Sequence, residues 1–395
     1  MRLVIYEDKQ SEQLYPLTEM HAAWDLLIGS ERLGVRIQRA LALADCRYQC
    51  RQELAAVMEE AGWSLFKGEG ISDTLFVNGL TVELPADELL QLQPGERVTD
   101  GAGNTVAFRL STAEQALTLD EEGYLQPPAS PAREVEARMI QEPWDLLTLN
   151  DSAIRQDFIP AEAAIELPGV TMINPDAIAL HSQAAVQPGV VLDASQGPIT
   201  IGSRSEIGAL SVIQGPVHIS TACRIKPHSH IYDATSLGPH CRIGGEVENA
   251  ICHSFVNKQH QGFVGHSLLM PWTNLGADTN TSDLKNNYSQ VRISRRGRME
   301  DSGQQFLGLL LGDHSKSAIN TQFNTGTVVG LFAQIFEAGF PEKEIPPFSW
   351  GGKEAGSYRL EDALNVAQLV MERRRLQLTD NMRKLITGLH RKATT

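Results

Sequence analysis

Residues 201–243 read IGSRSEIGALSVIQGPVHISTACRIKPHSHIYDATSLGPHCRI, and an aliphatic residue occupies every sixth position of this stretch. A helix repeats near 3.6 residues and a strand at 2, so neither explains the period. A six-residue repeat instead places one inward side chain on each face of a triangular β-coil. The stretch therefore predicts a parallel β-helix, with the inward positions Ile201, Ile207, Ile213, Ile219, Ile225, Ile231, Leu237 and Ile243.

The rhythm extends in both directions. Upstream it includes Leu180, Val186 and Leu192, and a slip through Gly197 and Pro198 restores the register. Downstream it returns after a polar gap, at Leu311, Phe323, Val329 and Ile335, with Ser317 as an interruption. Because a single coil cannot bury its own hydrophobic column, the coils should stack into one cooperative domain.

These patterns give the expected organisation of the C-terminal part. The β-helix should span residues 165–347, and a loop should leave it over residues 278–305, where polar residues dominate. Long loops on regular scaffolds often carry function. Residues 348–395 should hold a Pro-rich loop and a C-terminal α-helix over 360–392, which has apolar residues at helical spacing.

The N-terminal part alternates strand-like and helix-like stretches, which is typical of a small α/β domain over residues 1–130. Arg2–Tyr6 and Thr74–Val77 should be strands, and 30–43 should be a helix capped by Ser30. Residues 131–164 are expected to form a linker, with a short helix within 142–159.

Composition limits the possible functions of the chain. Its 395 residues carry 48 Asp and Glu against 34 Lys and Arg, a net charge of −14, which argues against a nucleic-acid-binding surface. No apolar run reaches the length of a membrane span, and the N-terminus lacks the apolar core of a signal peptide, so we expect a cytoplasmic protein. Five cysteines form neither a disulfide framework nor a metal pattern.

One segment within the predicted coils is rich in candidate site residues. It reads NKQHQGFVGHSLLMPWTNLGADTN over residues 257–280. It resembles the acetyltransferase half of the bifunctional N-acetylglucosamine-1-phosphate uridyltransferase and glucosamine-1-phosphate acetyltransferase family, which carries GHLTYLGD and then NIGAGT at the same separation. The resemblance implies a left-handed β-helix that uses acetyl-coenzyme A. It implies His260 as general base, Asn274 as a sugar contact, and a backbone amide near Ala277 that holds the thioester carbonyl.

The chain departs from that pattern at Phe263, where the family has Tyr, and at Asp278, where it has Gly. A divergent sugar nucleotidyltransferase branch of this group is more similar. The runs PWDLLTLN, GGEVENAICHSFVNKQHQGFVGHS, LKNNYS, LGDHSKSAINTQFNTGTVVG and PPFSWGG resemble it over most of residues 140–360. Lys285 and Tyr288 match the family's following loop loosely, and we expect them to contact substrate.

Charged residues near this segment are further candidates. Arg292, Arg295, Arg296 and Arg298, with Lys258 and Lys285, are the predicted group for a phosphate or the coenzyme A nucleotide, although an exposed loop tip also explains them. Glu248 lies two residues after Glu246, hence on the same strand face, where it would bind a sugar hydroxyl or a metal or remain solvated. His228 and His230 alternate, but they favour packing over a metal pair, and no metal site is predicted.

The first domain lacks two features of the related nucleotidyltransferases. Its first strand leads into EDKQSEQLYPLTEM, which has no glycine, whereas the related enzymes have a Gly-rich turn that holds nucleotide phosphates. A later strand ends in Asn78 and Gly79, where the family has a metal-binding Asp. Asp8, Arg32 and Arg36 remain candidates for a diverged site, which would need Mg²⁺ only if it is active.

The leading hypothesis is therefore a transferase that acetylates a sugar phosphate, glucosamine 1-phosphate being the expected acceptor, fused to a diverged nucleotidyltransferase-like domain. The resemblance also implies a homotrimer. Two alternatives stay open: a sugar-1-phosphate nucleotidyltransferase whose β-helix serves oligomerisation, and a non-catalytic trimeric scaffold that binds a sugar nucleotide.

Overall fold

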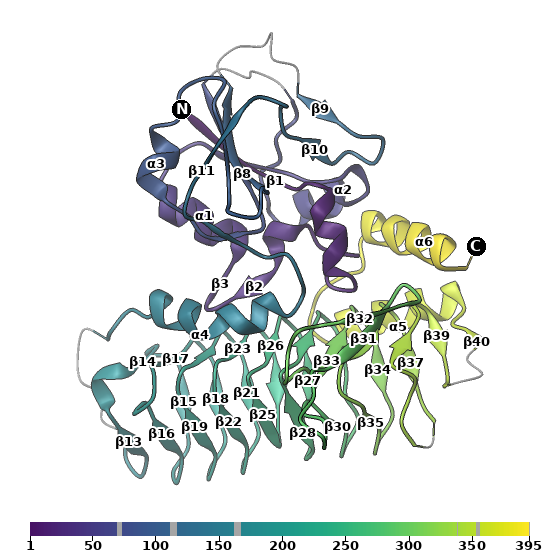
Figure 1. Cartoon of the computed structure of the whole chain (residues 1–395). Helices are drawn as coiled ribbons and strands as arrows, with labels where there is room; N and C mark the ends of the chain where they lie inside the picture. Colours follow the sequence, from purple (N-terminus) through teal and green to yellow (C-terminus); the bar gives the residue numbers. More distant parts are fainter. Residues whose placement is uncertain (69–72, 111–116, 162–166, 338, 353–355, 395) are drawn as a thin grey trace. The chain divides into compact units, whose positions relative to one another are not determined.

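A computed structural model describes residues 1–68, 73–110, 117–161, 167–337, 339–352 and 356–394 (Figure 1). The chain forms two compact units. Unit 1 comprises residues 1–26, 31–142 and 379–385, and unit 2 comprises residues 27–30, 143–378 and 386–395. The predicted domain boundary at residue 164 lies outside the described residues.

Unit 1 is built on a mixed sheet in the order β11-β7-β8-β5-β1-β4. Its strands are β1 (Arg2–Tyr6), β4 (Cys46–Gln49), β5 (Thr74–Asn78), β7 (Arg97–Thr99), β8 (Thr105–Leu110) and β11 (Ala132–Glu134). β1 pairs in parallel with both β4 and β5, so the carboxyl ends of these three strands share one edge. Helix α1 (Leu33–Leu41) lies against β1.

The remaining elements of this part are short. The helices are α2 (Gln52–Glu60) and α3 (Ala86–Leu90), and the short strands are β3 (Glu31–Arg32), β6 (Thr81–Glu83), β9 (Thr118–Leu119), β10 (Leu125–Gln126) and β12 (Arg138–Met139). The short strand β2 (Leu27–Ile28) belongs to unit 2. The two predicted strands are confirmed. The predicted Ser30 cap is wrong: α1 begins after Arg32, which makes no side-chain cap, because 31–32 pair as a strand.

Unit 2 is a parallel β-helix of about 10 turns that fits the left-handed β-helix fold. Its first face contains β13 (Thr171–Ile173), β16 (Val191–Asp193), β19 (Val212–Gln214), β22 (His230–Tyr232), β25 (Glu246–Glu248), β28 (Phe263–Gly265), β30 (Asn280–Thr281) and β35 (Gln322–Phe323). Its second face contains β14 (Ile178–Leu180), β17 (Ile199–Ile201), β20 (Val217–Ile219), β23 (Thr235–Leu237), β26 (Ile251–Cys252), β29 (Leu268–Leu269), β33 (Leu309–Leu311), β36 (Thr327–Val329) and β38 (Glu344–Ile345). Its third face contains β15 (Ala185–Val186), β18 (Glu206–Ile207), β21 (Arg224–Ile225), β24 (Arg242–Ile243), β27 (Asn257–Lys258), β34 (Lys316–Ser317), β37 (Gln334–Ile335), β39 (Ser349–Trp350) and β40 (Gly356–Ser357).

The predicted column is confirmed as the core of this prism. All eight residues from Ile201 to Ile243 are at most 3% exposed and belong to one hydrophobic cluster. They distribute over the three faces in turn, so Ile207, Ile225 and Ile243 stack in register on the third face. Gly238 has no room for a Cβ, which would collide with the carbonyl of His253 in the next coil. The six-residue period therefore fixes both the fold and its register.

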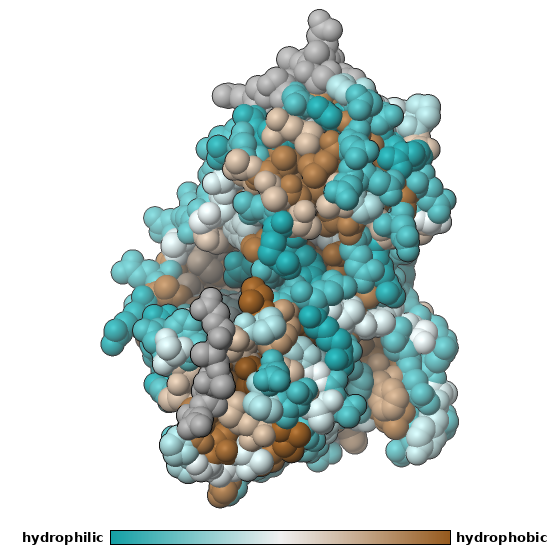
Figure 2. All heavy atoms as spheres, turned by 90° about the vertical axis from the view of Figure 1, so that its left-hand side faces the viewer, coloured by the Kyte–Doolittle hydropathy of each residue, from teal (hydrophilic) through white to brown (hydrophobic). Residues whose placement is uncertain are grey.

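Among the described residues, no strand pairs with the outer side of the first coil, whose strands β13 and β14 end their sheets. Figure 2 looks along the stack onto this end, where hydrophobic residues reach the surface, and Ile173 is 43% exposed.

The predicted short helix before the coils is confirmed as α4 (Asp145–Asp157), which contacts the second face of the β-helix. Its Asn150 Nδ2 donates a hydrogen bond to the carbonyl of Ala234 at 2.5 Å.

A ladder of aromatic rings follows the corner between the second and third faces. Its members stack from coil to coil with centroids 4.1 to 6.0 Å apart: His240, Phe255, Trp272, His314, Phe332 and Phe348. Each has a positive φ, between 54° and 65°. Non-glycine residues in this conformation are uncommon, and ring stacking from coil to coil accompanies it here.

Two expected elements differ in the structure. The predicted loop begins later than residue 278, because Thr281 is buried and Asn280–Thr281 pair with Gln322–Phe323 as part of the coil. The excursion that follows contains an antiparallel hairpin, β31 (Arg292–Arg295) and β32 (Arg298–Asp301). The single C-terminal helix is also wrong: α5 (Leu360–Glu372) and α6 (Asp380–Thr394) are separated by a turn in which Arg375 has a φ of 60°. No helix in the described part of the chain is both long and apolar enough to cross a membrane.

Candidate functional site

His260 lies at the corner where the chain passes from β27 on the third face to β28 on the first face. Its side chain is exposed and makes no hydrogen bond among the described residues, so the imidazole is accessible to a ligand. Its backbone is fixed, because its carbonyl accepts a hydrogen bond from Lys258 Nζ at 2.6 Å. The corner therefore presents an accessible imidazole on a rigid support.

Lys258 supplies this support from inside the coil. It stands in register with Ile243, at an inward position where the coils below carry isoleucine, and is 1% exposed. Its Nζ also donates to the Gly244 carbonyl at 3.0 Å. Burial lowers the pKa of Lys258 to about 8. Lys258, predicted to contact substrate, therefore has almost no exposed surface with which to do so, and its ammonium group is bonded to the backbone of the His260 corner.

Asn274 and Ala277 follow one coil later. Asn274 is on the third face, bridged in register to Asn257 and Lys316, and its Oδ1 accepts from Asn257 Nδ2 at 2.5 Å. Its side-chain Nδ2 makes no hydrogen bond with any residue that the structure describes. The carbonyl of Ala277 accepts from the N–H of Asn320 at 2.7 Å, whereas its own N–H has no hydrogen-bond partner among the residues described. An unpaired, half-exposed amide of this kind suits a developing oxyanion.

Asn274 lines a pocket of about 430 Å³ on the third face, closed on one side by the end of α5. The cationic side chains in its lining are Arg242, Lys316, Arg373 and Arg374. These are not the cations that the sequence pattern indicated. The sequence places them far apart, and only the folding of α5 onto this face brings them together.

Glu248 belongs to a polar cluster on the first face. The Tyr232 hydroxyl lies 2.7 Å from Glu246 Oε1 and 3.2 Å from Glu248 Oε2, so it links both carboxylates. Burial raises the pKa of Glu248, and the nearby charge of Asp283 adds to the shift, whereas His266 opposes it. A half-buried carboxylate of this kind can accept a hydrogen bond from a hydroxyl or bind an ammonium group.

His266, to which the resemblance assigns no chemistry, completes this cluster. Its Nδ1 lies 2.8 Å from Asp283 Oδ2, and its ring stacks on Phe306 with centroids 5.0 Å apart. A carboxylate that holds Nδ1 orients the ring and leaves Nε2 for an external proton. Sequence reasoning missed this dyad. The available signal was the 17-residue separation of His266 and Asp283, which is close to one coil.

The predicted basic loop is largely engaged in its own structure. Lys285 Nζ donates to the Gln290 carbonyl at 2.7 Å, and Tyr288 is 68% exposed. Arg295 pairs with Glu300 at 2.5 Å and lies over the Trp144 ring at 5.2 Å. Arg292 is exposed, and its carbonyl accepts from Lys343 Nζ. Within the hairpin, Arg292 is therefore more accessible to a phosphate than Arg295.

The other alternating histidine pair makes local contacts. His230 Nε2 lies 2.8 Å from Gln214 Oε1, and its ring packs 4.4 Å from that of Tyr232. His228 occupies a corner with a φ of 60°. These contacts agree with the packing role that the sequence favours.

In unit 1, one predicted candidate, Asp8, lies at the carboxyl edge of the parallel strands. Asp8 follows β1 and accepts from Asn78 Nδ2 at 2.7 Å, and burial raises the pKa of Asp8 to about 6. Glu7 is fully buried and pairs with Arg51 at 2.6 Å. Arg32 pairs with Asp25 at 3.2 Å, and Arg36 is buried. Asn78 thus places an amide, rather than a second carboxylate, beside Asp8 at this edge.

A pocket of about 670 Å³ opens beside this edge. Its lining includes Gln49 and Cys50 at the end of β4, Lys67, and Asp120. Binding crevices in open α/β sheets lie outside the carboxyl ends of strands, at points such as β1 where the connections diverge to opposite sides. This position and volume suit a nucleotide-sized ligand.

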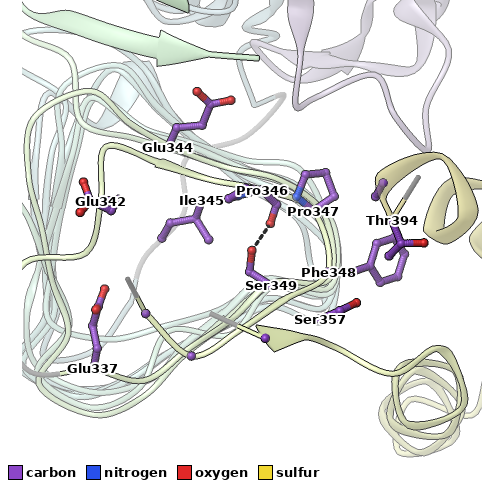
Figure 3. A pocket seen from close by; sticks show the side chains of 14 residues that line it. Glu337, Glu342, Glu344, Ile345, Pro346, Pro347, Phe348, Ser349, Ser357 and Thr394 are labelled. Atoms are coloured by element: carbon purple, nitrogen blue, oxygen red, sulfur yellow. Dashed lines mark hydrogen bonds between the residues drawn. The ribbon is translucent and has the colours of Figure 1, made fainter. Parts of the chain in front are cut away.

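A third pocket, of about 460 Å³, lies at the C-terminal end of unit 2. Figure 3 shows Glu337, Glu342 and Glu344 along one rim, opposite Phe348, while Ser349 Oγ donates to the Pro346 carbonyl at 2.7 Å. Glu344 already accepts from Ser294 Oγ at 2.7 Å. None of the lining residues described is a histidine or a cation, so this pocket offers no acyl-transfer chemistry.

Comparisons with known proteins give matches over part of the chain. Residues 3–163 match the family described as sugar nucleotidyl transferase. The bifunctional protein GlmU of Rippkaea orientalis is 27% identical over 147 residues, which cover 32% of each chain. A bifunctional sugar-1-phosphate nucleotidylyltransferase/acetyltransferase of Sulfurisphaera tokodaii is 27% identical over 152 residues, 38% of each chain. The GlmU protein of a Nostoc species is 25% identical over 257 residues, 59% of this chain and 53% of that protein.

The chain thus spans between a third and about half of the length of these curated relatives. Among solved structures, a mutant of GDP-perosamine N-acetyl transferase from Caulobacter crescentus is 11% identical and covers 90% of this chain and 96% of its own, with a TM-score of 0.17. That score is too low to carry an inference. Residues 3–163 are therefore similar to the sugar nucleotidyl transferase family, and the coils that follow them form a parallel β-helix of the kind that the hexapeptide repeat predicts.

Proposed function

We propose that unit 2 transfers an acetyl group from acetyl-coenzyme A to the amine of a sugar phosphate, with glucosamine 1-phosphate as the expected acceptor. The relatives support this reaction class, since one of them is named as an acetyltransferase as well as a nucleotidylyltransferase. The segment from His260 to Ala277 supplies the groups that the reaction needs.

Each group has a defined role. The free amine attacks the thioester carbonyl carbon, and His260 accepts the proton that the nitrogen loses. The N–H of Ala277 stabilises the carbonyl oxygen as it becomes negative. Breakage of the carbon–sulfur bond then releases the coenzyme A thiolate, which takes the proton back from His260. Asn274 binds the sugar through its amide nitrogen.

The proposal depends most on the position of His260, which lies at the corner between two faces of opposite charge. The first face carries Glu248 and the His266–Asp283 pair, and the third face carries Arg242, Lys316 and the end of α5. The amine of the acceptor sugar matches the acidic first face, and the phosphate groups of the reactants match the basic third face.

The direct test is thiol release from acetyl-coenzyme A. We expect release that depends on glucosamine 1-phosphate, while N-acetylglucosamine 1-phosphate, which lacks the amine, gives none. Equal thiol release with both compounds would show that the thioester is only hydrolysed. If glucosamine 1-phosphate and every other amino sugar phosphate fail to cause thiol release, the proposal is wrong.

A second function is favoured by the match of residues 3–163 and the 670 Å³ pocket: nucleotidyl transfer to a sugar 1-phosphate, which would use Mg²⁺. Against it, Asp8 is bonded to Asn78, and the edge lacks a Gly-rich turn. We therefore expect weak or no binding of nucleoside triphosphate. Pyrophosphate release from uridine triphosphate and a sugar phosphate with Mg²⁺ would instead place this function first. Binding of a nucleotide sugar without either activity would favour the scaffold.

The flat faces of the β-helix also support a homotrimer, because a cyclic three-fold contact closes with identical chains. A 43.3 kDa chain should then sediment as a species of about three times that mass. A lone monomer at micromolar concentration would contradict the trimer.

A further inference from the structure

The basic pocket on the third face is built by coils stacked in register. The outward side chains of Arg242, Asn257, Asn274 and Lys316 follow one another from coil to coil. Neighbouring strands lie about 4.8 Å apart, so their polar groups are spaced closely enough for one small ligand to reach several of them. The residues that follow α5 add Arg373 and Arg374 from the opposite side.

This pocket concentrates positive charge that its own lining does not neutralise. None of its described lining residues is acidic. Burial lowers the pKa of Lys316 to about 8, and burial together with neighbouring arginines lowers the pKa of Arg242 and of Arg374 below the usual range. Arg224, the next cation along the face, already has a partner, Glu206, at 3.4 Å. Holding like charges together is unfavourable unless an anion joins them.

The pocket also has more donors than acceptors. Nε of Arg242 is buried and has no hydrogen-bond partner in the described part of the chain. The side chains of Arg373 and Arg374 make no hydrogen bond or ion pair with any described residue. Lys316 donates once to a described residue, the His314 carbonyl at 2.7 Å, which leaves two N–H groups for a ligand. An acceptor-rich ligand would satisfy all of them.

A helix C-terminus alone explains part of this arrangement, because cations near the last turn interact favourably with the helix dipole. It does not explain why Arg374 faces Arg242, whose charge opposes its own. The volume of about 430 Å³ exceeds what a single phosphate fills, and the cations line both walls. Two adjacent phosphates match this distribution better than one.

We infer that this pocket binds the diphosphate group of an organic diphosphate, held between the coil residues Arg242 and Lys316 and the residues Arg373 and Arg374 that follow α5. The diphosphate has two chemical sources in the proposed reactions, coenzyme A and a nucleotide sugar. The inference rests on the proposed function, in which the third face receives a phosphate group, and it names a diphosphate as that group. Binding is measured without turnover, so its failure is distinguishable from a failure of acetyl transfer.

The test is calorimetric titration of the full chain with inorganic pyrophosphate. We expect Arg242→Gln and Arg374→Gln to weaken binding by about tenfold or more, as expected for loss of a charged hydrogen bond. Arg375→Gln is the matched control, because Arg375 is adjacent and exposed but does not line the pocket, and it should change affinity by less than about twofold.

Coenzyme A, uridine diphosphate and adenosine monophosphate complete the experiment. Tighter binding of coenzyme A would identify the acyl donor as the source, and tighter binding of uridine diphosphate would identify a nucleotide sugar; either supports the site. Unchanged affinity in Arg374→Gln, whose half-exposed position just after α5 does not threaten the fold, would overturn the inference. Equal affinity for adenosine monophosphate and pyrophosphate would overturn it as well.

Discussion

The first and third faces of the β-helix share one core and one register but carry opposite charge. On the first face, Tyr232, Glu248 and the His266–Asp283 pair form an acidic, hydrogen-bonded cluster. On the third face, Arg242 and Lys316 meet the arginines that follow α5 in a pocket that is short of acceptors. The six-residue repeat therefore determines which side chains point inward and which point outward. It does not determine the charge of the outward side chains, so two faces of one β-helix can bind different chemical groups.

His260 stands at the corner that joins these faces, and Lys258 fixes that corner from within. A lysine in an isoleucine column costs stability through desolvation, because burial disfavours its charged form. That cost is offset in part by two carbonyl acceptors, of which one belongs to His260. We therefore propose that the acidic first face binds the amine, that the basic third face binds phosphate groups, and that His260 at the corner between them transfers the proton.

The largest expected effect comes from breaking the core that both faces share. Ile225→Asp would bury a carboxylate without a partner, a penalty of several kcal/mol against a total stability of about 5–15 kcal/mol. Thermal unfolding should show loss of the cooperative β-helix transition. The matched control is Ile319→Asp, since Ile319 is 67% exposed. An unchanged melting temperature for Ile225→Asp would show that the register is wrong.

A smaller effect should separate the two faces. Glu248→Gln removes a carboxylate from the first face and should raise KM for the amino sugar phosphate about tenfold, the expected loss for one charged hydrogen bond. KM for acetyl-coenzyme A should stay the same. Glu206→Gln on the third face is the control, because Glu206 pairs with Arg224 and lies outside both sites. If the two variants behave alike, the first face does not bind the amine.

The smallest effect should appear in the pH dependence of the third face. With its pKa near 8, Lys316 is protonated at lower pH and neutral above it, while the arginines stay charged and His240, whose pKa burial lowers, stays neutral. Affinity for sulfate, whose charge is constant here, should therefore fall severalfold as the pH rises from about 7 to about 9. Lys316→Met should bind more weakly and without this slope. If sulfate affinity still falls with pH in Lys316→Met, a group other than Lys316 titrates in this range.

Much of the fold was predictable because the repeat is local. Ile201 to Ile243 identify the coils and their register from the sequence alone, and the corner position of His260 follows from the same period. The break between α5 and α6 was not predictable in this way. Apolar spacing continues past it, and the turn that contains Arg375 carries neither glycine nor proline to mark it.

The two charged sites depend on contacts between residues that are distant in the sequence. Arg242 and Arg374 meet only because α5 folds back onto the third face, and a six-residue repeat does not indicate which face a following helix covers. His266 and Asp283 come together because they are 17 residues apart, which is the length of one irregular coil rather than of a regular 18-residue coil. In unit 1, the sequence shows Asn78 at the end of a predicted strand, but the bond from Asn78 to Asp8 depends on the pairing of β1 with β5.

The central claim is that the corner imidazole, rather than the dyad on the first face, transfers the proton. The measurement is steady-state acetylation of glucosamine 1-phosphate by His260→Ala and His266→Ala, with acetyl-coenzyme A binding measured in parallel. We expect His260→Ala to lower kcat by about 10²–10⁴ and to leave acetyl-coenzyme A affinity unchanged, whereas His266→Ala should lower kcat by less than about tenfold. Wild-type turnover in His260→Ala, or the reverse order of the two losses, would contradict it.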